Sequence, residues 1–336
     1  MKISDFDYEL PVEKIAKFPP KVRGTSNLLV LDRKTCQIED RKYSDLVDYL
    51  KPGDVLVLNN TKVIKARLLT ERTDGAKREI VLLEKHSDEN NNYRHKVMYR
   101  GKLSVGDELI VGKAKITVDE IIGDGIAVVR SDTDLIKLAE KYGLPPLPPY
   151  IKREATKEDI KRYQTVFAKT AGSVAAPTAS LNMTDELLKK IVRKGVKVKY
   201  LTLHVGLGTF MPIRENEVEK HQMHSEYFEI PDDTIKAIKN ARRVVAVGTT
   251  VARTLEYAIP ENLRSGEADI FIYPGYEFKV IDALITNFHA PRSTVLMLTS
   301  AFAGWDNLRN AYEHAKTHGY KFLSYGDSML IVGDKE

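Results

Sequence analysis

The sequence of 336 residues contains a single cysteine, Cys36, and a single tryptophan. One cysteine excludes an intrachain disulfide and a metal centre built from several thiolates, and it is typical of a protein from a reducing compartment. No segment approaches the roughly 20 consecutive apolar residues of a membrane-spanning helix, and the first residues lack the apolar segment of a secretion signal. We therefore expect a cytoplasmic protein that contacts no membrane.

The sequence also lacks a large excess of charge of either sign, since 52 Lys and Arg face 47 Asp and Glu, a net charge of +5. Hydrophobic residues make up 43% and charged residues 29%. These values are close to the globular average and exclude disordered and collagen-like chains. An isoelectric point near 8.9 permits a polyanionic partner without requiring one. The length favours two domains.

Six short runs rich in β-branched and apolar residues follow one another between about residues 67 and 129, separated by glycine- and asparagine-containing turns. Regularly spaced short strands predict a small barrel or sandwich. A helix is expected over 134–143. The proline-rich segment 144–150 then fits a stiff linker better than a ligand for an SH3-type partner, because proline cannot extend a helix or a central strand.

Helix and strand patterns alternate after residue 184, which is typical of a layered α/β domain with a mainly parallel sheet. The expected helices cover 184–194, 231–242, 251–258, 293–304 and 307–319, and the expected strands cover 196–204, 243–248, 269–274, 283–288 and 328–332. Nearer the start we expect strands over 27–32 and 55–60 and brief helices over 11–18 and 44–50. The fold class is therefore α/β, with a domain from residues 1–65 and 148–336 and an inserted small β-barrel domain from 66–147.

Candidate binding residues follow the predicted strands, because open α/β sheets bind ligands beyond the carboxyl ends of their strands. Glycines let a backbone approach a ligand closely, and hydroxyls at a helix start suit a carboxylate or phosphate, although simple capping explains them equally well. In chain order, the candidates are Gly206, Gly208, Thr209, Phe210, Thr249, Thr250, Tyr276, Asn287, Phe288 and Arg292.

Four histidines are candidate acids or bases, because imidazole titrates near neutral pH. His204 and His289 each follow a predicted strand, and His221 and His224 stand three residues apart beside glutamates. The latter pair has a spacing that could hold zinc, but we favour a catalytic or RNA-facing pair, or a solvated face, over a metal site.

Two stretches of the sequence are dense in lysine and arginine, and charge runs of this kind are most often solvated faces. One lies within 189–199 and includes Lys189, Lys190, Arg193 and Lys194; the other lies within 152–162. Together they flank a loop of small residues, so they also fit a footprint for a phosphate backbone. We expect the four named residues of the first stretch, Lys189 to Lys194, to contact such a partner.

Many longer motifs in one order resemble a single family, the S-adenosylmethionine:tRNA ribosyltransferase-isomerases of queuosine biosynthesis. The resemblance covers nearly the whole chain. It rests on DFDYELP, PGDVLVLNNTKV, LPPLPPYIKR, RYQTVFAK, AAPTASLNMT, LTLHVGLGTFMPI, HQMHSEYFEIP, AVGTTVARTLE, DIFIYPGYEFKVIDALITNFHAPRSTVLML and SYGDSMLI.

The resemblance implies an unusual alkyl transfer. The ribosyl part of S-adenosylmethionine moves onto the aminomethyl group of 7-aminomethyl-7-deazaguanine at the wobble position of tRNA, and adenine and methionine leave. The ribose rearranges to give epoxyqueuosine. S-adenosylmethionine is then a consumed substrate, and we expect no cofactor, no metal and a monomeric enzyme.

The chemistry of this reaction suggests roles for the candidate residues. His204, His221, His224 and His289 are hypothetical acids and bases, Thr249, Thr250 and Arg292 suit the methionine carboxylate, and Phe210, Tyr276 and Phe288 could stack on a purine. The chain departs from the family where Asn182 replaces the usual histidine of PTAGLHFT. This departure is the basis of an alternative, a non-catalytic tRNA-binding protein on the same scaffold.

Overall fold

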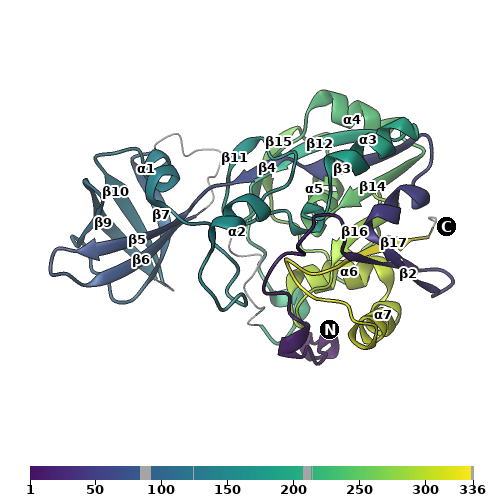
Figure 1. The fold of residues 1–336 in the computed structure, drawn as a ribbon, viewed down its shortest axis with the longest axis horizontal. Coiled ribbons are helices and arrows are strands. Elements are labelled where there is room, and N and C mark those ends of the chain that lie inside the picture. Colours follow the sequence, from purple (N-terminus) through teal and green to yellow (C-terminus); the bar gives the residue numbers. More distant parts are fainter. Residues whose placement is uncertain (84–91, 124, 207–212, 214, 334–336) are drawn as a thin grey trace.

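The structure is a computed structural model that combines a helix-flanked nine-stranded sheet with a closed barrel beside it (Figure 1). It describes residues 1–336 except 84–91, 124, 207–212, 214 and 334–336. Among the described residues, no helix has the length and apolar character needed to cross a membrane.

The nine-stranded sheet is assembled from both ends of the chain. Its order is β15 (Ser265–Ala268), β13 (Glu226–Glu229), β12 (Lys197–Leu203), β3 (Asp54–Asn59), β14 (Arg243–Val247), β16 (Ala283–Asn287), β17 (Ser328–Val332), β1 (Asn27–Asp32) and β2 (Ile38–Lys42). Strands β12, β3, β14 and β16 are parallel, which confirms the predicted parallel centre. The sheet as a whole is mixed, because β17 is antiparallel to β16 and β1 is parallel to β17.

Both faces of the sheet are covered by helices. The 3₁₀ helix η3 (Tyr43–Tyr49) and α3 (Asp185–Arg193) pack on one face, and α4 (Asp232–Lys239), α5 (Thr249–Ala258), α6 (Thr294–Ala303) and α7 (Trp305–Thr317) pack on the other. Strand residues alternate between the two cores, so Leu28 and Val30 join the first while Leu29 and Leu31 join the second. Each such buried side chain stabilises the fold by about 1.5–3 kcal/mol relative to an exposed one.

The barrel contains all six strands expected from the sequence. They are β5 (Arg67–Arg72), β6 (Lys77–Leu82), β7 (Arg94–Arg100), β8 (Glu108–Val111), β9 (Ala114–Gly123) and β10 (Ile126–Ser131), and they close in the order β10-β7-β6-β5-β8-β9. Inward side chains such as Leu68, Ile80 and Val97 are fully buried. Leu135 and Leu138 of helix α1 (Leu135–Tyr142) pack against this core.

The connection from the barrel back to the sheet contains one helix and one short strand. Helix α2 (Lys157–Arg162) lies between the barrel and the sheet (Figure 1). Strand β11 (Thr170–Ser173) then pairs in parallel with β4 (Thr61–Val63), on the segment by which the chain leaves the sheet for the barrel.

Two sequence-based expectations about local structure are wrong. Residues 269–274 form no strand: β15 stops at Ala268, where its partner β13 begins, so the next residues have no edge to pair with. Residues 11–18 form only the 3₁₀ turn η2 (Val12–Lys14), because Lys14 and Ala16 make backbone hydrogen bonds with Phe322 and stretch the chain. The brief helix expected over 44–50 is present, as the 3₁₀ helix η3.

Candidate active site

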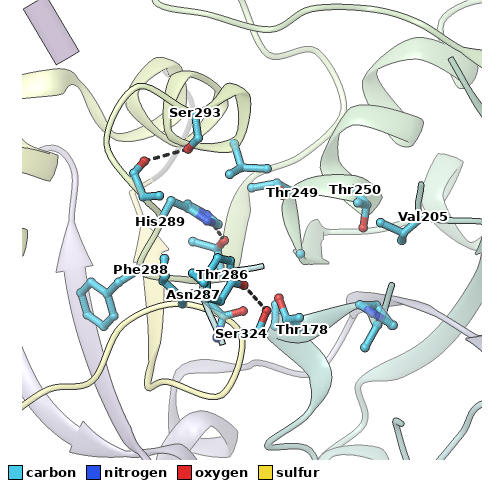
Figure 2. A pocket seen from close by; sticks show the side chains of 18 residues that line it. Thr178, Val205, Thr249, Thr250, Thr286, Asn287, Phe288, His289, Ser293 and Ser324 are labelled. Atoms are coloured by element: carbon cyan, nitrogen blue, oxygen red, sulfur yellow. Dashed lines mark hydrogen bonds between the residues drawn. The ribbon is translucent and has the colours of Figure 1, made fainter. Parts of the chain in front are cut away.

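A cavity opens at the edge of the sheet where the parallel strands β14 and β16 end (Figure 2). Its walls come from the segments after three parallel strands: Val205 after β12, residues 248–250 after β14, and residues 286–290 at the end of β16. Tyr150, residues 176–179, Ser293, Val295, Leu323 and Ser324 complete the lining. The location agrees with the general rule for open α/β sheets.

The start of α5 forms one wall of this cavity. Gly248, with φ of 101°, makes the turn from β14 into the helix, and this left-handed conformation favours glycine. Among the described residues, no side chain caps α5. The first N–H groups of a helix have no partner within it, so they can bind an anionic group. Thr249 and Thr250 thus lie where the sequence placed them, beside a site suited to a carboxylate.

A second, smaller cavity adjoins the first on the other side of this helix start. It shares Thr249, Thr250 and Val295 with the main cavity and is also lined by Phe271 and Arg253. The two hollows therefore meet at the first turn of α5. A ligand that binds the helix start can therefore extend in two directions.

His289 lies in the main cavity, held by hydrogen bonds on its ring and on its backbone. The Nε2 atom is 2.8 Å from Oγ1 of Thr286, and Figure 2 draws this contact as a dashed line. Its backbone N–H donates to the Tyr312 hydroxyl over 2.9 Å, and its carbonyl accepts from the hydroxyl of Tyr8. Loss of solvation lowers the pKa of His289 to about 3, so the ring is neutral at neutral pH. Nδ1 is then the nitrogen able to contact a substrate.

Asn287 and Phe288 of the same segment differ in what they offer a ligand. The Asn287 side chain is 3% exposed and donates from Nδ2 to the carbonyl of Asp327, and its Oδ1 has no partner among the described residues. An unsatisfied buried acceptor in a cavity wall is a binding group. Phe288, in contrast, is fully buried and packs against Tyr312, Tyr320 and Phe322. Its ring is therefore not available to stack on a purine in this structure.

His204 stands behind the wall formed by Val205. Its Nδ1 is 2.9 Å from the Thr61 hydroxyl, its ring stacks on Tyr227, and burial lowers its pKa to about 4. The ring packs so closely on Gly172 that a Cβ there would lie 2.7 Å from it. His204 is thus a second neutral imidazole, more enclosed than His289.

The backbone after β12 is fixed by a buried ion pair. The amide of Gly206 donates to Oε1 of Glu226 over 2.9 Å, and Glu226 pairs with Arg253 of α5. Both partners are less than 5% exposed. This pair connects the predicted glycine to the helix that borders both cavities. Three further predicted residues, Gly208, Thr209 and Phe210, lie outside the described residues.

Four other predicted residues lie outside the cavity lining. His221 contacts the ring of Phe271, which lines the second cavity, while His224 is exposed. Tyr276 packs on Phe278 and its hydroxyl is 3.4 Å from Glu256. Arg292 is about half exposed and pairs with Asp7 of the N-terminal segment. The structure therefore gathers only part of the predicted set around one cavity.

The basic residues of α3 lie toward the opposite edge of the sheet. Lys194 donates to the carbonyl of Val47, and Gly195 accepts from the amide of Gly53, just before β3 begins. The six residues of β3 span about 20 Å. In the described part of the chain, none of Lys189, Lys190, Arg193 and Lys194 lines the cavity. Their contact with a phosphate backbone stays a prediction.

Comparison with known proteins shows the family to which the chain belongs. Residues 3–331 match the family described as queuosine biosynthesis protein. The chain belongs to this family. It is 54% identical to the S-adenosylmethionine:tRNA ribosyltransferase-isomerase of Chlorobaculum parvum, over 98% of this chain and all of that protein.

Two further relatives widen the comparison. The family member of the same name from a Sulfurihydrogenibium species is 50% identical over 99% of this chain and all of its own. The crystal structure of S-adenosylmethionine tRNA ribosyltransferase from Thermotoga maritima is 36% identical, covers 98% of this chain and all of its own, and superimposes with a TM-score of 0.56.

Asn182, where this chain departs from the usual family histidine, has a structural role. It is 3% exposed, and its Nδ2 donates to the carbonyl of Gly326 and to the hydroxyl of Ser328. These bonds attach the loop before α3 to the start of β17. Asn182 is absent from the described lining of the cavity. In this chain the residue at this position therefore connects two segments beside the cavity.

Several residues that line the cavity are not apparent as candidates from the sequence. Tyr150, Thr178, Ser293 and Ser324 were not candidates, and Thr286 was only part of a predicted strand. The direction of the strands places Ser324 at the cavity. Because β17 is antiparallel to β16, it starts at the edge of the sheet where β16 ends, and Ser324 comes shortly before β17. Tyr150 reaches the same place through a 2.5 Å hydrogen bond to the Ser324 hydroxyl.

Proposed function

We propose that this protein transfers the ribosyl moiety of S-adenosylmethionine onto 7-aminomethyl-7-deazaguanine at the wobble position of tRNA and isomerises it, with release of adenine and methionine. Membership of the queuosine family supports this reaction. The observation that carries the assignment of the site is the cavity in which the uncapped start of α5 faces the Thr286–His289 pair.

The helix start suits the methionine end of the substrate. Its first N–H groups, which no side chain of the described residues caps, can hold the α-carboxylate, helped by the hydroxyl groups of Thr249 and Thr250. Arg292 was a candidate for this role, but Asp7 already neutralises it outside the described lining. We therefore assign the carboxylate to α5.

His289 suits the leaving adenine better than proton abstraction from carbon. The positive sulfur of the substrate acidifies the neighbouring ribose carbon, and a base must remove a proton there. An imidazole whose pKa is about 3 is a weak base, whereas as a neutral ring it can donate a hydrogen bond from Nδ1. The Thr286 hydroxyl can donate to Nε2 and so favour the tautomer with hydrogen on Nδ1.

Adenine release tests the function and the role of His289 together. The protein is incubated with S-adenosylmethionine and tRNA carrying the deazaguanine precursor, and free adenine is measured chromatographically. We expect His289→Ala to lower turnover roughly 100-fold or more with folding intact. His318→Ala, at the exposed residue that follows α7, is the matched control and should keep wild-type turnover.

Two outcomes contradict these assignments separately. Binding of tRNA by the wild-type protein without any adenine release would favour the non-catalytic alternative. Normal turnover of His289→Ala would remove His289 from the reaction and leave the function in place.

A further inference from the structure

The surface around α2 joins two segments that are far apart in the sequence. The guanidinium of Arg153 donates from Nε to the carbonyl of Lys17 over 2.8 Å. Arg23 in turn donates to the carbonyls of Leu181 and Gln164 over 2.8 and 3.0 Å. Arg162 of α2 donates to the carbonyl of Lys21 over 3.4 Å. The segment 17–23 is thus held against the linker and α2, and we infer that the exposed side chains of both segments share one face.

This face, which we call the α2 surface, is rich in exposed cations. Its members are Lys17, Lys21, Lys152, Lys157 and Lys161, together with Phe18. Among the described residues, none of these lysines forms an ion pair with a carboxylate. The nearby glutamates are Glu154, which is exposed, and Glu158, which lies 3.7 Å from Arg162. The lysines outnumber them and can therefore bind an anionic partner.

Phe18 gives the α2 surface an aromatic plane. Its side chain is 59% exposed, and the guanidinium carbon of Arg153 lies 4.1 Å from the centre of its ring. An exposed ring among cations is a stacking platform for an unpaired base, because every base has a flat π face.

The α2 surface is fixed to the wall of the active-site cavity. The hydroxyl of Tyr325 donates to Oδ1 of Asp159 in α2 over 2.7 Å, and the preceding residue, Ser324, lines the cavity. Ile151 shares an apolar cluster with Ala176, another lining residue. A ligand on this surface is therefore next to the cavity, whereas the basic end of α3 lies across the sheet.

We propose that the α2 surface binds the phosphate backbone of the tRNA anticodon arm, with an unpaired base stacked on Phe18. This inference rests on the proposed function. It places the RNA contacts on the linker and α2 and not on α3. Since the wobble base must enter the cavity, the cations that hold its neighbouring phosphates must lie beside the cavity mouth.

A pair of matched double variants tests this surface. Lys157→Ala/Lys161→Ala and Lys189→Ala/Lys190→Ala each remove two exposed cations from one helix. Binding of a fluorescent anticodon stem-loop is measured by anisotropy over a series of KCl concentrations. We expect the α2 variant to bind about tenfold more weakly and to lower the slope of log K against log salt by about one to two units. The α3 variant should match wild type.

Two further variants separate charge from shape. Lys157→Arg/Lys161→Arg should restore binding, because arginine keeps the charge. Phe18→Leu should weaken binding about fivefold or more with an unchanged salt slope, since stacking is lost and charge is kept. Val22→Ala, an exposed apolar residue in the same segment, is its control and should bind normally.

The outcomes distinguish this surface from the proposed function. Wild-type adenine release together with unchanged RNA binding by the α2 variant would overturn the α2 surface alone. Weaker binding by the α3 variant instead would also overturn it and would restore the sequence-based assignment. Capture of an acidic protein at this surface, with RNA binding unaffected, would give the lysines another partner and overturn the proposal. Absence of adenine release by the wild-type protein would overturn the function itself.

Discussion

Helices α2 and α3 are similar in sequence and differ in what surrounds them. Each begins after a threonine cap, Thr156 or Thr184, carries acidic residues in its first turn and ends in basic residues. In α2 the carboxylate of Asp159 is buried and accepts hydrogen bonds from Arg153, Thr156 and Tyr325. The first turn of α3 is held mainly by the capping bond of Thr184. α2 is attached beside the cavity, and α3 covers one face of the sheet.

The difference shows why charge density alone does not locate an RNA contact. Both stretches look equally suitable in the sequence, and α3 has the longer run of cations. The direction of the strands decides between them. β17 and β1 run against the central strands, so the segments that precede them, including residues 17–23, reach the edge that holds the cavity.

Removing the buried carboxylate of α2 should give the largest effect. Asp159→Ala leaves the Arg153 guanidinium without its bidentate partner at 2.7 and 2.8 Å, and we expect the free energy of unfolding to fall by about 3 kcal/mol. Stem-loop binding should weaken at least tenfold. Urea denaturation and anisotropy measure the two changes. The control is Asp185→Ala, in the exposed first turn of α3, which should lower the free energy of unfolding by less than about 1 kcal/mol and leave stem-loop binding intact. Equal effects of the two variants would contradict the difference between the helices.

Removing the helix caps should give a smaller and more selective effect. Thr156→Ala and Thr184→Ala each lose a side-chain cap and should lower the free energy of unfolding by about 1 kcal/mol. Only Thr156→Ala should weaken stem-loop binding, by a fewfold, because it loosens the helix beside the cavity. If Thr184→Ala weakened binding as much, α3 would have to be part of the RNA contact.

The smallest effect concerns pH. Burial raises the pKa of Asp159, but hydrogen bonds from Arg153, Thr156 and Tyr325 outweigh it and hold the pKa well below its usual value. The resulting stability is fully present well above pH 4 and is lost as the pH falls, because the unfolded chain takes up the proton first. From pH 6 to pH 4 the contribution of Asp159 should fall by about 0.3 kcal/mol. Urea denaturation of wild type and Asp159→Asn at both pH values measures it; a difference between the two proteins that did not narrow at pH 4 would contradict the assignment.

Much of the secondary structure could be predicted because its signals are local. The barrel strands follow from β-branched runs between turns, and α3 follows from Thr184 ahead of an amphipathic pattern. The failures occur where distant contacts override local preference. Residues 269–274 read as a strand but lack a neighbouring edge, and residues 11–18 read as a helix but are stretched along Phe322.

The site could be predicted in part for the same reason. Thr249 and Thr250 follow the parallel strand β14, and Asn287 and His289 stand at and just after the end of β16. The order of elements in the sequence is enough to apply the rule for the carboxyl ends of parallel strands. Phe288 has the same position in the sequence, yet its ring points into the aromatic core. Successive side chains at the end of a strand point in different directions, but the sequence does not show which of them faces the ligand.

The sequence by itself determined the family, the six barrel strands, the parallel centre of the sheet and the cavity edge at its carboxyl ends. These depend on local patterns and on motifs of consecutive residues. Tertiary structure alone decided the reversed direction of β17 and β1, the lowered pKa of His289 and the separation of the two basic helices. Each of these depends on which distant segments pack together, since burial and pairing partners set the pKa of a histidine and the edge at which a strand begins.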